Sequence, residues 1–378
     1  MLGERIRQAR LAAGLTLRDL AGRVGVSASA ISKYEHGTDR PRQSTLLAIG
    51  RALAIPVERL LLPQPVSLSI IEFRKRASLP VYKQEQIEAR VKAELEPYID
   101  LLELVSPGMA DCCDSVVIAQ SVVTDLDQVE LFADNLRQQW GLGSGPISNV
   151  VETVEIAGVR VITDVGDDRF DELACVANGK YPVVVVKALP EGKGDRQRFN
   201  VLHGLGHLLL RAEAGLDKEK MCHRFAAAML VPRDTARKRL GATRKMLDIG
   251  YELPKLKKEF GLSISAWVNR ASDLGIIGEE ARKSLFISLS TRGWKKSEPV
   301  GIELESPSSF RMLVHRAKVE GIISPVKAAE YLGAMHRKLL PDIKESDIPE
   351  SAVSAYAAGG SLDAWDDMGA GGNASAAR

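Results

Sequence analysis

The sequence predicts a multidomain fold in which an all-α bundle is followed by an α+β domain and then by a helical carboxyl-terminal region. Three observations support this order. Short amphipathic segments separated by glycines fill the first sixty residues, apolar runs typical of strands stand between helical segments in the middle of the chain, and helical spacing alone continues beyond them. With 378 residues, 45% of them hydrophobic and 26% charged, the chain has the composition of an ordinary folded protein of two or three domains.

Five short helices are expected in the first domain, residues 1–62, over residues 3–13, from 16, over 27–34, over 45–53 and from 56. Gly14 ends the first helix, because glycine readily takes the left-handed conformation that closes a helix. Thr16 caps the second helix, with Asp19 in the acidic position of a capping box, and Ser27 caps the third. Pro56 suits the first turn of the fifth helix, where its missing N–H is not needed.

The same segment carries an excess of positive charge. Ten arginines and lysines stand against five aspartates and glutamates in residues 1–60, whereas the whole chain has a net charge of only +2. An excess of five charges on so small a domain indicates an anionic partner.

A tight glycine turn joins the second and third helices, and the third has a small, polar outer surface, which is the arrangement of a helix-turn-helix. The run LRDLAGRVGVSASAISKYEHGTDRPRQSTLLAIGRAL resembles the Cro/C1 (XRE) family over about residues 5–60. The resemblance implies that a double-stranded DNA operator is bound, by a homodimer. It also implies contacts to base edges and phosphates by Ser27, Ala28, Ser29, Ser32 and Lys33, with Tyr34 and Arg42 on the DNA backbone.

Arg18 departs from this family, which often has glutamine near the start of the second helix. Arginine favours contact with phosphate or guanine, so the family's preferred operator sequences do not carry over. The alternative for the whole segment is a small helical bundle used for protein contacts.

Residues 63–118 are expected to be a linker followed by a connecting helix. Apolar residues at three- and four-residue intervals predict one helix over 81–105, with a kink at Pro97. A basic patch, Arg-Lys-Arg at residues 74–76, precedes this helix. We expect it to be a solvated surface, and the alternative is contact with flanking DNA.

The α+β domain is expected over residues 119–240. Its predicted elements are helices over 126–140 and 150–156, strands over 159–165 and 181–187, a helix around two histidines and a helix from Asp217. The second strand, YPVVVVK, is apolar enough to be buried on both faces.

His203 and His207 lie four residues apart in the apolar run RFNVLHGLGHLLLR, so on a helix they project from one face and can hold one metal ion. A catalytic zinc site needs a third protein ligand, and Glu219 on the next helix is the best candidate. His223 is an alternative ligand, although packing against the site or orienting a ligand suits it better. We expect Zn²⁺, while Mn²⁺ or Fe²⁺ would suit the same donors. The opposing interpretation is that the histidines are ordinary core or surface residues.

Three motifs of this domain, WGLGxxPI, DRxRFxxxHxLGHLLL and EKxCHRFAAAMLVP, resemble the ImmA/IrrE family of metallopeptidases. The runs FGLSISAWVNRASDLGII and RGWKKSEP are similar to members of that family that follow a Cro/C1 domain, so the resemblance spans about residues 5–340. It implies an α+β zincin-like fold with zinc held by His203, His207 and Glu219. It also implies a regulatory peptidase, or a regulator linked to stress, phage and mobile-element control.

Gly204 departs from the family's pattern, because it occupies the position of the general-base glutamate in HExxH. That glutamate is worth roughly 10² to 10⁴ in rate, so its loss leaves metal binding nearly intact and cripples hydrolysis. We therefore expect a DNA-binding regulator whose metal domain is a sensor or binds a partner. One alternative is a zinc metallopeptidase that cleaves a repressor, with Gly204 an inactivating change or with Glu213 acting in its place. Another is an antitoxin-like or structural protein with an empty site.

The rest of the chain is expected to be structural. Residues 241–345 form a helical region, in which 253–277 contains two packed helices or, as the weaker alternative, a second DNA contact. The Gly-, Ala- and Ser-rich tail at 346–378 is expected to be disordered. No apolar run reaches the roughly 20 residues of a membrane helix and the start of the chain is charged, so a cytoplasmic protein with no membrane partner is expected. The four cysteines, including the adjacent pair at 112–113 and a buried Cys222, are expected to stay reduced.

Overall fold

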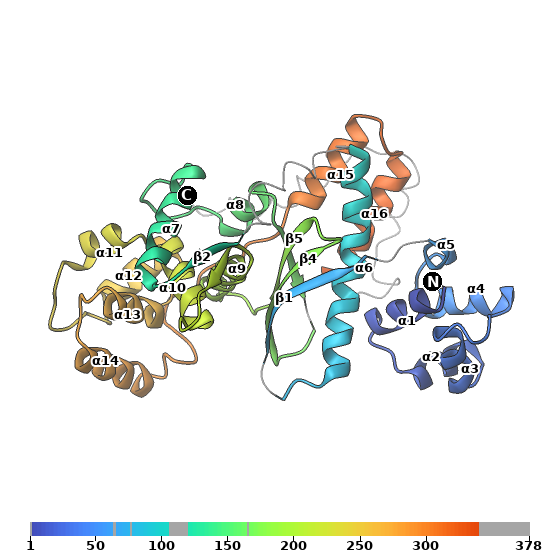
Figure 1. The fold of residues 1–378 in the computed structure, drawn as a ribbon, viewed down its shortest axis with the longest axis horizontal. Helices are drawn as coiled ribbons and strands as arrows, with labels where there is room; N and C mark the ends of the chain where they lie inside the picture. The colour runs from blue at the N-terminus through green and yellow to red at the C-terminus, as the bar shows by residue number, and fades with distance from the viewer. Residues whose placement is uncertain (1, 63–65, 76–77, 106–119, 165, 340–378) are drawn as a thin grey trace, which may run out of the picture. The chain divides into compact units, whose positions relative to one another are not determined.

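The computed structural model describes residues 2–62, 66–75, 78–105, 120–164 and 166–339 (Figure 1). Three expectations lie outside the described residues: the disordered tail at 346–378, the cysteine pair at 112–113 and the start of the α+β domain at 119. The chain divides into two units, and the second begins at Lys318.

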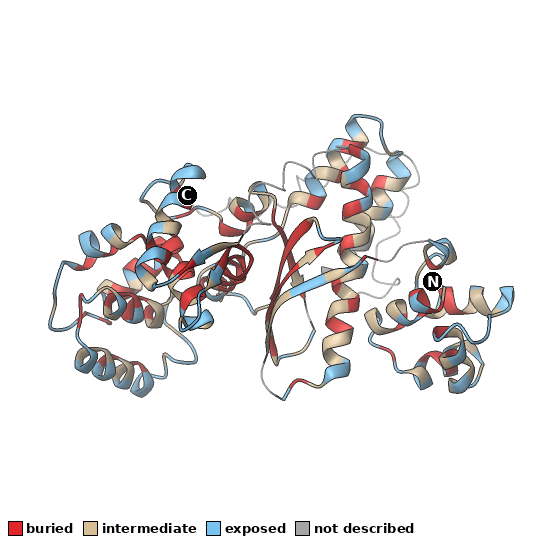
Figure 2. Ribbon diagram, in the orientation of Figure 1, coloured by how far each residue is buried: buried red, intermediate tan, exposed pale blue. Residues whose placement is uncertain are grey.

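Five helices form the amino-terminal bundle: α1 (Leu2–Ala12), α2 (Leu17–Val24), α3 (Ala28–Glu35), α4 (Gln43–Ala52) and α5 (Val57–Leu61). The predicted capping box is confirmed, because the Thr16 hydroxyl accepts from the Asp19 N–H and the Asp19 carboxylate accepts from the Thr16 N–H. Ser27 caps α3 as predicted, by accepting a hydrogen bond from the Ala30 N–H. The bundle closes around a fully buried apolar core (Figure 2), which includes Ile6, Leu20, Ile31, Ile49 and Leu60.

A buried ion pair ties α1 to α3. Arg10 Nε and Nη2 donate to the two carboxylate oxygens of Glu35 at 2.6 and 2.9 Å, and Nη1 donates to the Leu15 carbonyl oxygen at 2.8 Å. The two helices also approach closely at Gly3, where a Cβ atom would lie 2.3 Å from the carbonyl oxygen of Tyr34. The buried ion pair between Arg10 and Glu35 therefore fixes how α1 packs against the carboxyl-terminal end of α3.

Four strands form the larger sheet, in the order β1 (Leu68–Lys75), β4 (Phe170–Ala177), β5 (Tyr181–Lys187) and β3 (Arg160–Asp164). β4 runs antiparallel to β1 and β5, while β3 and β5 are parallel. β3 and β5 are the two strands that the sequence predicts. β1 and β4 are additional, and β1 corrects the interpretation of residues 63–118 as a linker followed by a helix.

Both additional strands lack a clean apolar alternation. The pairing of β1 with β4 shifts register between Ile70 and Glu72 and again between Arg74 and Lys75, which breaks the two-residue period of a strand. β4 carries two adjacent acidic residues, its second and third, inside an otherwise apolar run. Strand formation depends on the pairing partner as much as on the strand's own residues, so neither β1 nor β4 can be predicted from its own sequence pattern.

The sheet is packed on both faces (Figures 1 and 2). α6 (Val81–Val105), with the predicted bounds, covers one face and shares a core with Val183 and Val185 of β5. α9 (Gly194–Leu209), the histidine helix, shares the other core with Val184 and Val186. β5 is therefore buried on both faces, as predicted.

The remaining helices are α7 (Leu126–Gln139), α8 (Val150–Ile156), α10 (Lys218–Leu230), α11 (Arg233–Leu240), α12 (Glu252–Phe260), α13 (Ile264–Asp273), α14 (Glu279–Thr291), α15 (Ser309–Val319) and α16 (Pro325–Leu339). A second sheet, which the sequence does not predict, pairs β2 (Ser121–Val123) with β6 (Leu210–Ala212) in parallel. Phe260 of α12 and Trp267 of α13 pack in the same core as Leu205 of α9, which supports packing as the role of residues 253–277. Among the described helices, none is both long and apolar enough to cross a membrane.

Replacing Glu35 by alanine tests the buried pair of the bundle. The variant leaves the Arg10 guanidinium buried without a counter-charge, which costs about 3–5 kcal/mol. In hydrogen-exchange mass spectrometry of the full chain, the amides of α1 and α3 should exchange about a hundredfold faster or more. Glu58→Ala, at an exposed position of α5, is the matched control and should change exchange little.

Candidate metal centre

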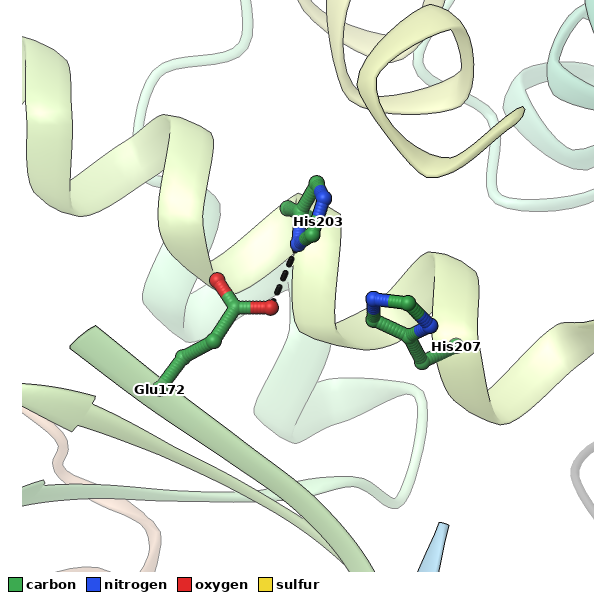
Figure 3. Close-up of side chains that lie close together, drawn as sticks. All are labelled: Glu172, His203 and His207. Atoms are coloured by element: carbon green, nitrogen blue, oxygen red, sulfur yellow. Dashed lines mark hydrogen bonds and ion pairs between the residues drawn. The ribbon is translucent and has the colours of Figure 1, made fainter. Parts of the chain in front are cut away.

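The candidate centre is built on α9, whose residues from Val201 to Leu209 are all buried. His203 and His207 stand one turn apart on this helix and share a side of it (Figure 3). Their ring centroids are 4.8 Å apart. The spacing predicted from the sequence thus brings the two imidazoles together.

Glu219 faces both imidazoles from the first turn of α10. Its Oε2 lies 3.6 Å from His203 Nε2 and its Oε1 lies 3.4 Å from His207 Nε2, while its side chain is 46% exposed. Both Nε2 atoms are buried, and neither has a hydrogen-bond partner among the described residues. Two buried nitrogens with unused lone pairs therefore point toward one half-exposed carboxylate.

Glu172 is a site residue that sequence reasoning missed. It lies on β4, is almost completely buried, and its Oε1 is hydrogen-bonded to His203 Nδ1 (Figure 3). The only signal in the sequence was an acidic side chain inside the run FDELACVA, and its meaning depends on β4 pairing beneath α9. Glu172 fixes the orientation of the His203 ring.

His207 is held by different contacts. The Cys222 Sγ lies 3.3 Å from its Nδ1, and the Gln120 side-chain amide donates to its carbonyl oxygen at 2.7 Å. Cys222 is buried as predicted, and burial raises the pKa of its thiol. Each imidazole thus has a partner at Nδ1 that leaves Nε2 facing Glu219.

Burial sets the protonation of the site. It lowers the pKa of His203 to about 3, with a further contribution from Arg74, and lowers that of His207 to about 3. It also raises the pKa of Glu172 to about 8, against the opposing effect of Arg74. The imidazoles are consequently neutral at physiological pH. A neutral His203 offers its Nε2 lone pair when the proton sits at Nδ1 and is donated to Glu172, which is the arrangement found around metal-binding histidines.

Two residues of β1 reach the same site. Glu72 forms a possible metal-binding group with His207 and Glu219, although Lys218 donates to its Oε2 at 2.7 Å. Arg74 contacts the site rather than only solvent, which corrects the interpretation of the basic patch as a solvated surface for this residue, while for the rest of the patch it stays a prediction. Two other groups could hold an ion: Glu172, His203 and His207, or His203, Glu219 and His223. None of the three groups combines His203, His207 and Glu219, the set predicted from the sequence.

The ring nitrogens of His223 are both engaged. Nδ1 lies 2.7 Å from the carbonyl oxygen of Glu219 on its own helix, and Nε2 lies 3.4 Å from Arg74 Nη2. The ring packs on that of His203, with centroids 4.6 Å apart. These contacts favour a supporting role for His223 over that of a ligand.

Gly204 faces the sheet instead of the Glu219 side of the helix. A Cβ atom at this position would lie 2.8 Å from Val184 Cγ1 of β5, which is closer than packed carbons approach. Gly206, two residues on, is similarly tight against α10, where its Cβ would meet Phe225 Cδ1 at 3.1 Å. The two glycines lower the helix propensity locally and let α9 pack closely against both β5 and α10.

Glu213 does not join the site. It is exposed just after β6 and belongs to none of the groups of carboxylates and imidazoles that the structure brings together. Glu72 is the half-buried carboxylate that lies closer to the histidines.

The residues expected at DNA lie on α2, on α3 with its cap, and at the start of α4. Five are exposed: Arg18, Ser27, Ser29, Lys33 and Arg42. Three are half-buried: Ala28, Ser32 and Tyr34, the last packed against the bundle core. Their contact with DNA stays a prediction.

The fold and the site together define a chain with a helix-turn-helix domain followed by a metallopeptidase-like α+β domain. Comparison with protein families agrees: residues 6–60 match the helix-turn-helix model and residues 158–272 match that of the IrrE N-terminal-like domain. These matches confirm the two resemblances predicted from the sequence. His203, His207, Glu219 and Glu172 lie inside the second match, whereas Glu72 and Arg74 lie outside it.

One curated relative is described as an uncharacterized transcriptional regulator in the ATPase CF(0) region of Rhodospirillum rubrum. It is 46% identical over 57 residues, which are 15% of this chain and 53% of the relative. The chain thus spans about half the length of that relative. No solved structure matches the chain.

A double-mutant cycle tests the packing at Gly204. Gly204→Ala should destabilise the protein by about 1–2 kcal/mol, because the clash with Val184 outweighs the better helix propensity of alanine. In a Val184→Ala background the same change should be neutral or stabilising, since the methyl groups it meets are gone. Urea unfolding followed by tryptophan fluorescence gives the four free energies. Equal effects in the two backgrounds would rule out the close contact.

Proposed function

We propose that this chain is a DNA-binding regulator whose α+β domain binds a divalent metal ion through His203, His207 and Glu219 and hydrolyses peptides poorly. In this proposal the metal domain is a sensor or a partner-binding module. The observation that carries it is the pair of buried Nε2 atoms that face Glu219 and have no hydrogen-bond partner among the described residues, beside Gly204, which packs against Val184.

The donor distances support the ligand set. Zinc binds imidazole nitrogen and carboxylate oxygen at about 2.0–2.1 Å, so neighbouring ligand atoms of a tetrahedral site stand about 3.4 Å apart. Glu219 comes close to this separation with a different oxygen for each histidine: Oε2 lies 3.6 Å from His203 Nε2 and Oε1 lies 3.4 Å from His207 Nε2. Glu172 supports the set from behind His203, as carboxylates commonly do for zinc-bound histidines. When bound, the ion would supply a Lewis acid and an open position for one further ligand, and the same donors also suit Mn²⁺ or Fe²⁺.

Poor hydrolysis follows from the packing of Gly204. A general base must stand within hydrogen-bond reach of the attacking water. A side chain at position 204 would begin 2.8 Å from Val184 Cγ1, so a glutamate there would require Val184 or α9 to shift. Restoring the glutamate by a single substitution is therefore a poorer test of the site than the metal itself.

The amino-terminal domain supports DNA as the partner. The bundle carries an excess of five positive charges, and exposed Arg18, Ser29, Lys33 and Arg42 lie on or beside the helix-turn-helix. The relative in Rhodospirillum rubrum, which shares 57 aligned residues with this chain, is described as a transcriptional regulator. We propose that the chain binds a two-fold operator as a homodimer, as the Cro/C1 resemblance implies.

A zinc metallopeptidase that cleaves a repressor is the second candidate, and one observation favours it. Glu72 is 28% exposed and lies within reach of His207 and Glu219, so it could take the place of the missing base. Its ion pair with Lys218 lowers the pKa of Glu72 against the effect of burial, which weakens it as a base.

Metal content is the decisive measurement for the centre. Elemental mass spectrometry of the purified full chain should find about one metal ion per protomer, and His203→Ala should lose it because one of three ligands is removed. His36→Ala, an exposed histidine of the DNA-binding bundle, is the matched control and should keep the metal. A metal-free wild-type protein would contradict the proposal. Peptide hydrolysis that Glu72→Gln abolishes would instead establish the second candidate.

DNA binding has its own test. Once an operator has been selected from random DNA, Lys33→Ala should weaken binding and lower the slope of log K against log salt by about one, because one phosphate contact is lost. Lys295→Ala, at an exposed position outside the bundle, should leave both quantities unchanged. An unchanged slope in Lys33→Ala would remove this residue from the interface.

A further inference from the structure

Arg74 is a cation placed among the candidate metal ligands by a strand outside the matched IrrE N-terminal-like domain. Its Nε lies 3.7 Å from Glu219 Oε2, its Nη1 lies 4.0 Å from Glu172 Oε2, and its Nη2 lies 3.4 Å from His223 Nε2. The side chain is 31% exposed. A guanidinium here disfavours a metal ion by charge repulsion, so its position needs another explanation.

The contacts of Arg74 do not use its donors fully. Both carboxylate oxygens lie beyond 3.5 Å, which is longer than a hydrogen bond, so neither glutamate forms the two parallel bonds that arginine makes with a well-placed carboxylate. Oε2 of Glu172 is itself buried without a hydrogen-bond partner among the described residues. The planar guanidinium group of Arg74 therefore lies near the site without a hydrogen bond to either carboxylate.

The net charge of the site with a metal ion bound explains the position of Arg74. A bound divalent ion favours the ionised form of the neighbouring carboxylates, so the ion and Arg74 bring three positive charges against the negative charges of Glu172 and Glu219. Lys218 neutralises Glu72 across 2.7 Å. The loaded site thus carries one positive charge in excess, on the side where Glu219 and Arg74 are partly exposed. A single negative charge on the incoming ligand would balance it.

We propose that Arg74 holds a carboxylate ligand at the open position of the metal centre. This inference rests on the proposed metal centre and names the chemical class that the centre receives. A carboxylate can accept two parallel hydrogen bonds from the planar guanidinium group of arginine. Its single negative charge also balances the one excess positive charge of the site better than the higher charge of phosphate does. Since Gly204 provides no base, the ligand is bound without being consumed, as a receptor requires.

The test uses Co²⁺ as the probe metal in the full-length protein, because its visible absorption reports a change of ligand directly. Acetate and inorganic phosphate are titrated separately at constant ionic strength. Acetate should shift the spectrum of the wild-type protein and bind more tightly than phosphate. Arg74→Gln should weaken acetate binding by roughly tenfold or more.

The same variant separates an electrostatic role from a structural one. Loss of a positive charge beside the ligands should make Arg74→Gln bind Co²⁺ as tightly as the wild type or several-fold more tightly, whereas damage to the site would weaken Co²⁺ binding. Arg74→Lys keeps the charge but not the fork, and should weaken acetate binding less than Arg74→Gln. Arg239→Gln removes a partly exposed arginine that pairs with Glu259 and should change neither affinity.

Three results would overturn the inference and leave the metal centre standing: acetate binding that Arg74→Gln does not change, Co²⁺ binding that this variant weakens, or a preference for phosphate. If Arg74→Gln does not fold, acetate affinity equal to that of the wild type in Arg74→Lys would count against the bidentate contact. A wild-type protein that takes up no Co²⁺ would overturn the proposed function, and the role of Arg74 with it.

Discussion

The close contact between α9 and β5 is the constraint on which the candidate centre depends. With only a hydrogen at Gly204, the helix backbone settles against Val184, and the whole segment from Val201 to Leu209 is buried. Burial in turn lowers the pKa of His203 and His207 to about 3. Gly204 is thus part of the packing that keeps the imidazoles neutral, and a neutral imidazole is the form that binds a metal.

The centre is assembled from segments far apart in the sequence. α9 supplies the histidines, α10 supplies Glu219, β4 supplies Glu172 beneath His203, and β1 supplies Glu72 and Arg74. β1 follows closely after α5, the last helix of the DNA-binding bundle. It is therefore the shortest covalent connection between that bundle and the metal centre. A regulator needs such a connection if a ligand in one domain is to affect the other, although proximity alone does not establish coupling.

The chemistry of the site favours binding over turnover. The three donors, their neutral imidazoles and the orienting Glu172 are features of a metal site. Two carboxylates near the site already have other partners: Glu172 is hydrogen-bonded to His203, and Glu72 accepts a hydrogen bond from Lys218. Arg74 adds positive charge on the open side, which suits an anionic ligand.

Features that depend on local order along the chain could be predicted from the amino-acid sequence. The capping box at Thr16 and Asp19, the helix at 81–105, the doubly buried strand at 181–187 and the shared face of His203 and His207 all follow from spacings within one element. The family matches confirm the two domain types that these patterns and motifs predicted. Only the tertiary structure decided which residues stand opposite the histidines. Glu172 and Arg74 reach the site because β4 and β1 pair across almost a hundred residues of chain, and Gly204 shows its role only against Val184 of a neighbouring strand. Strand pairing depends on partners distant in sequence, whereas a helical face depends on residues three and four positions away.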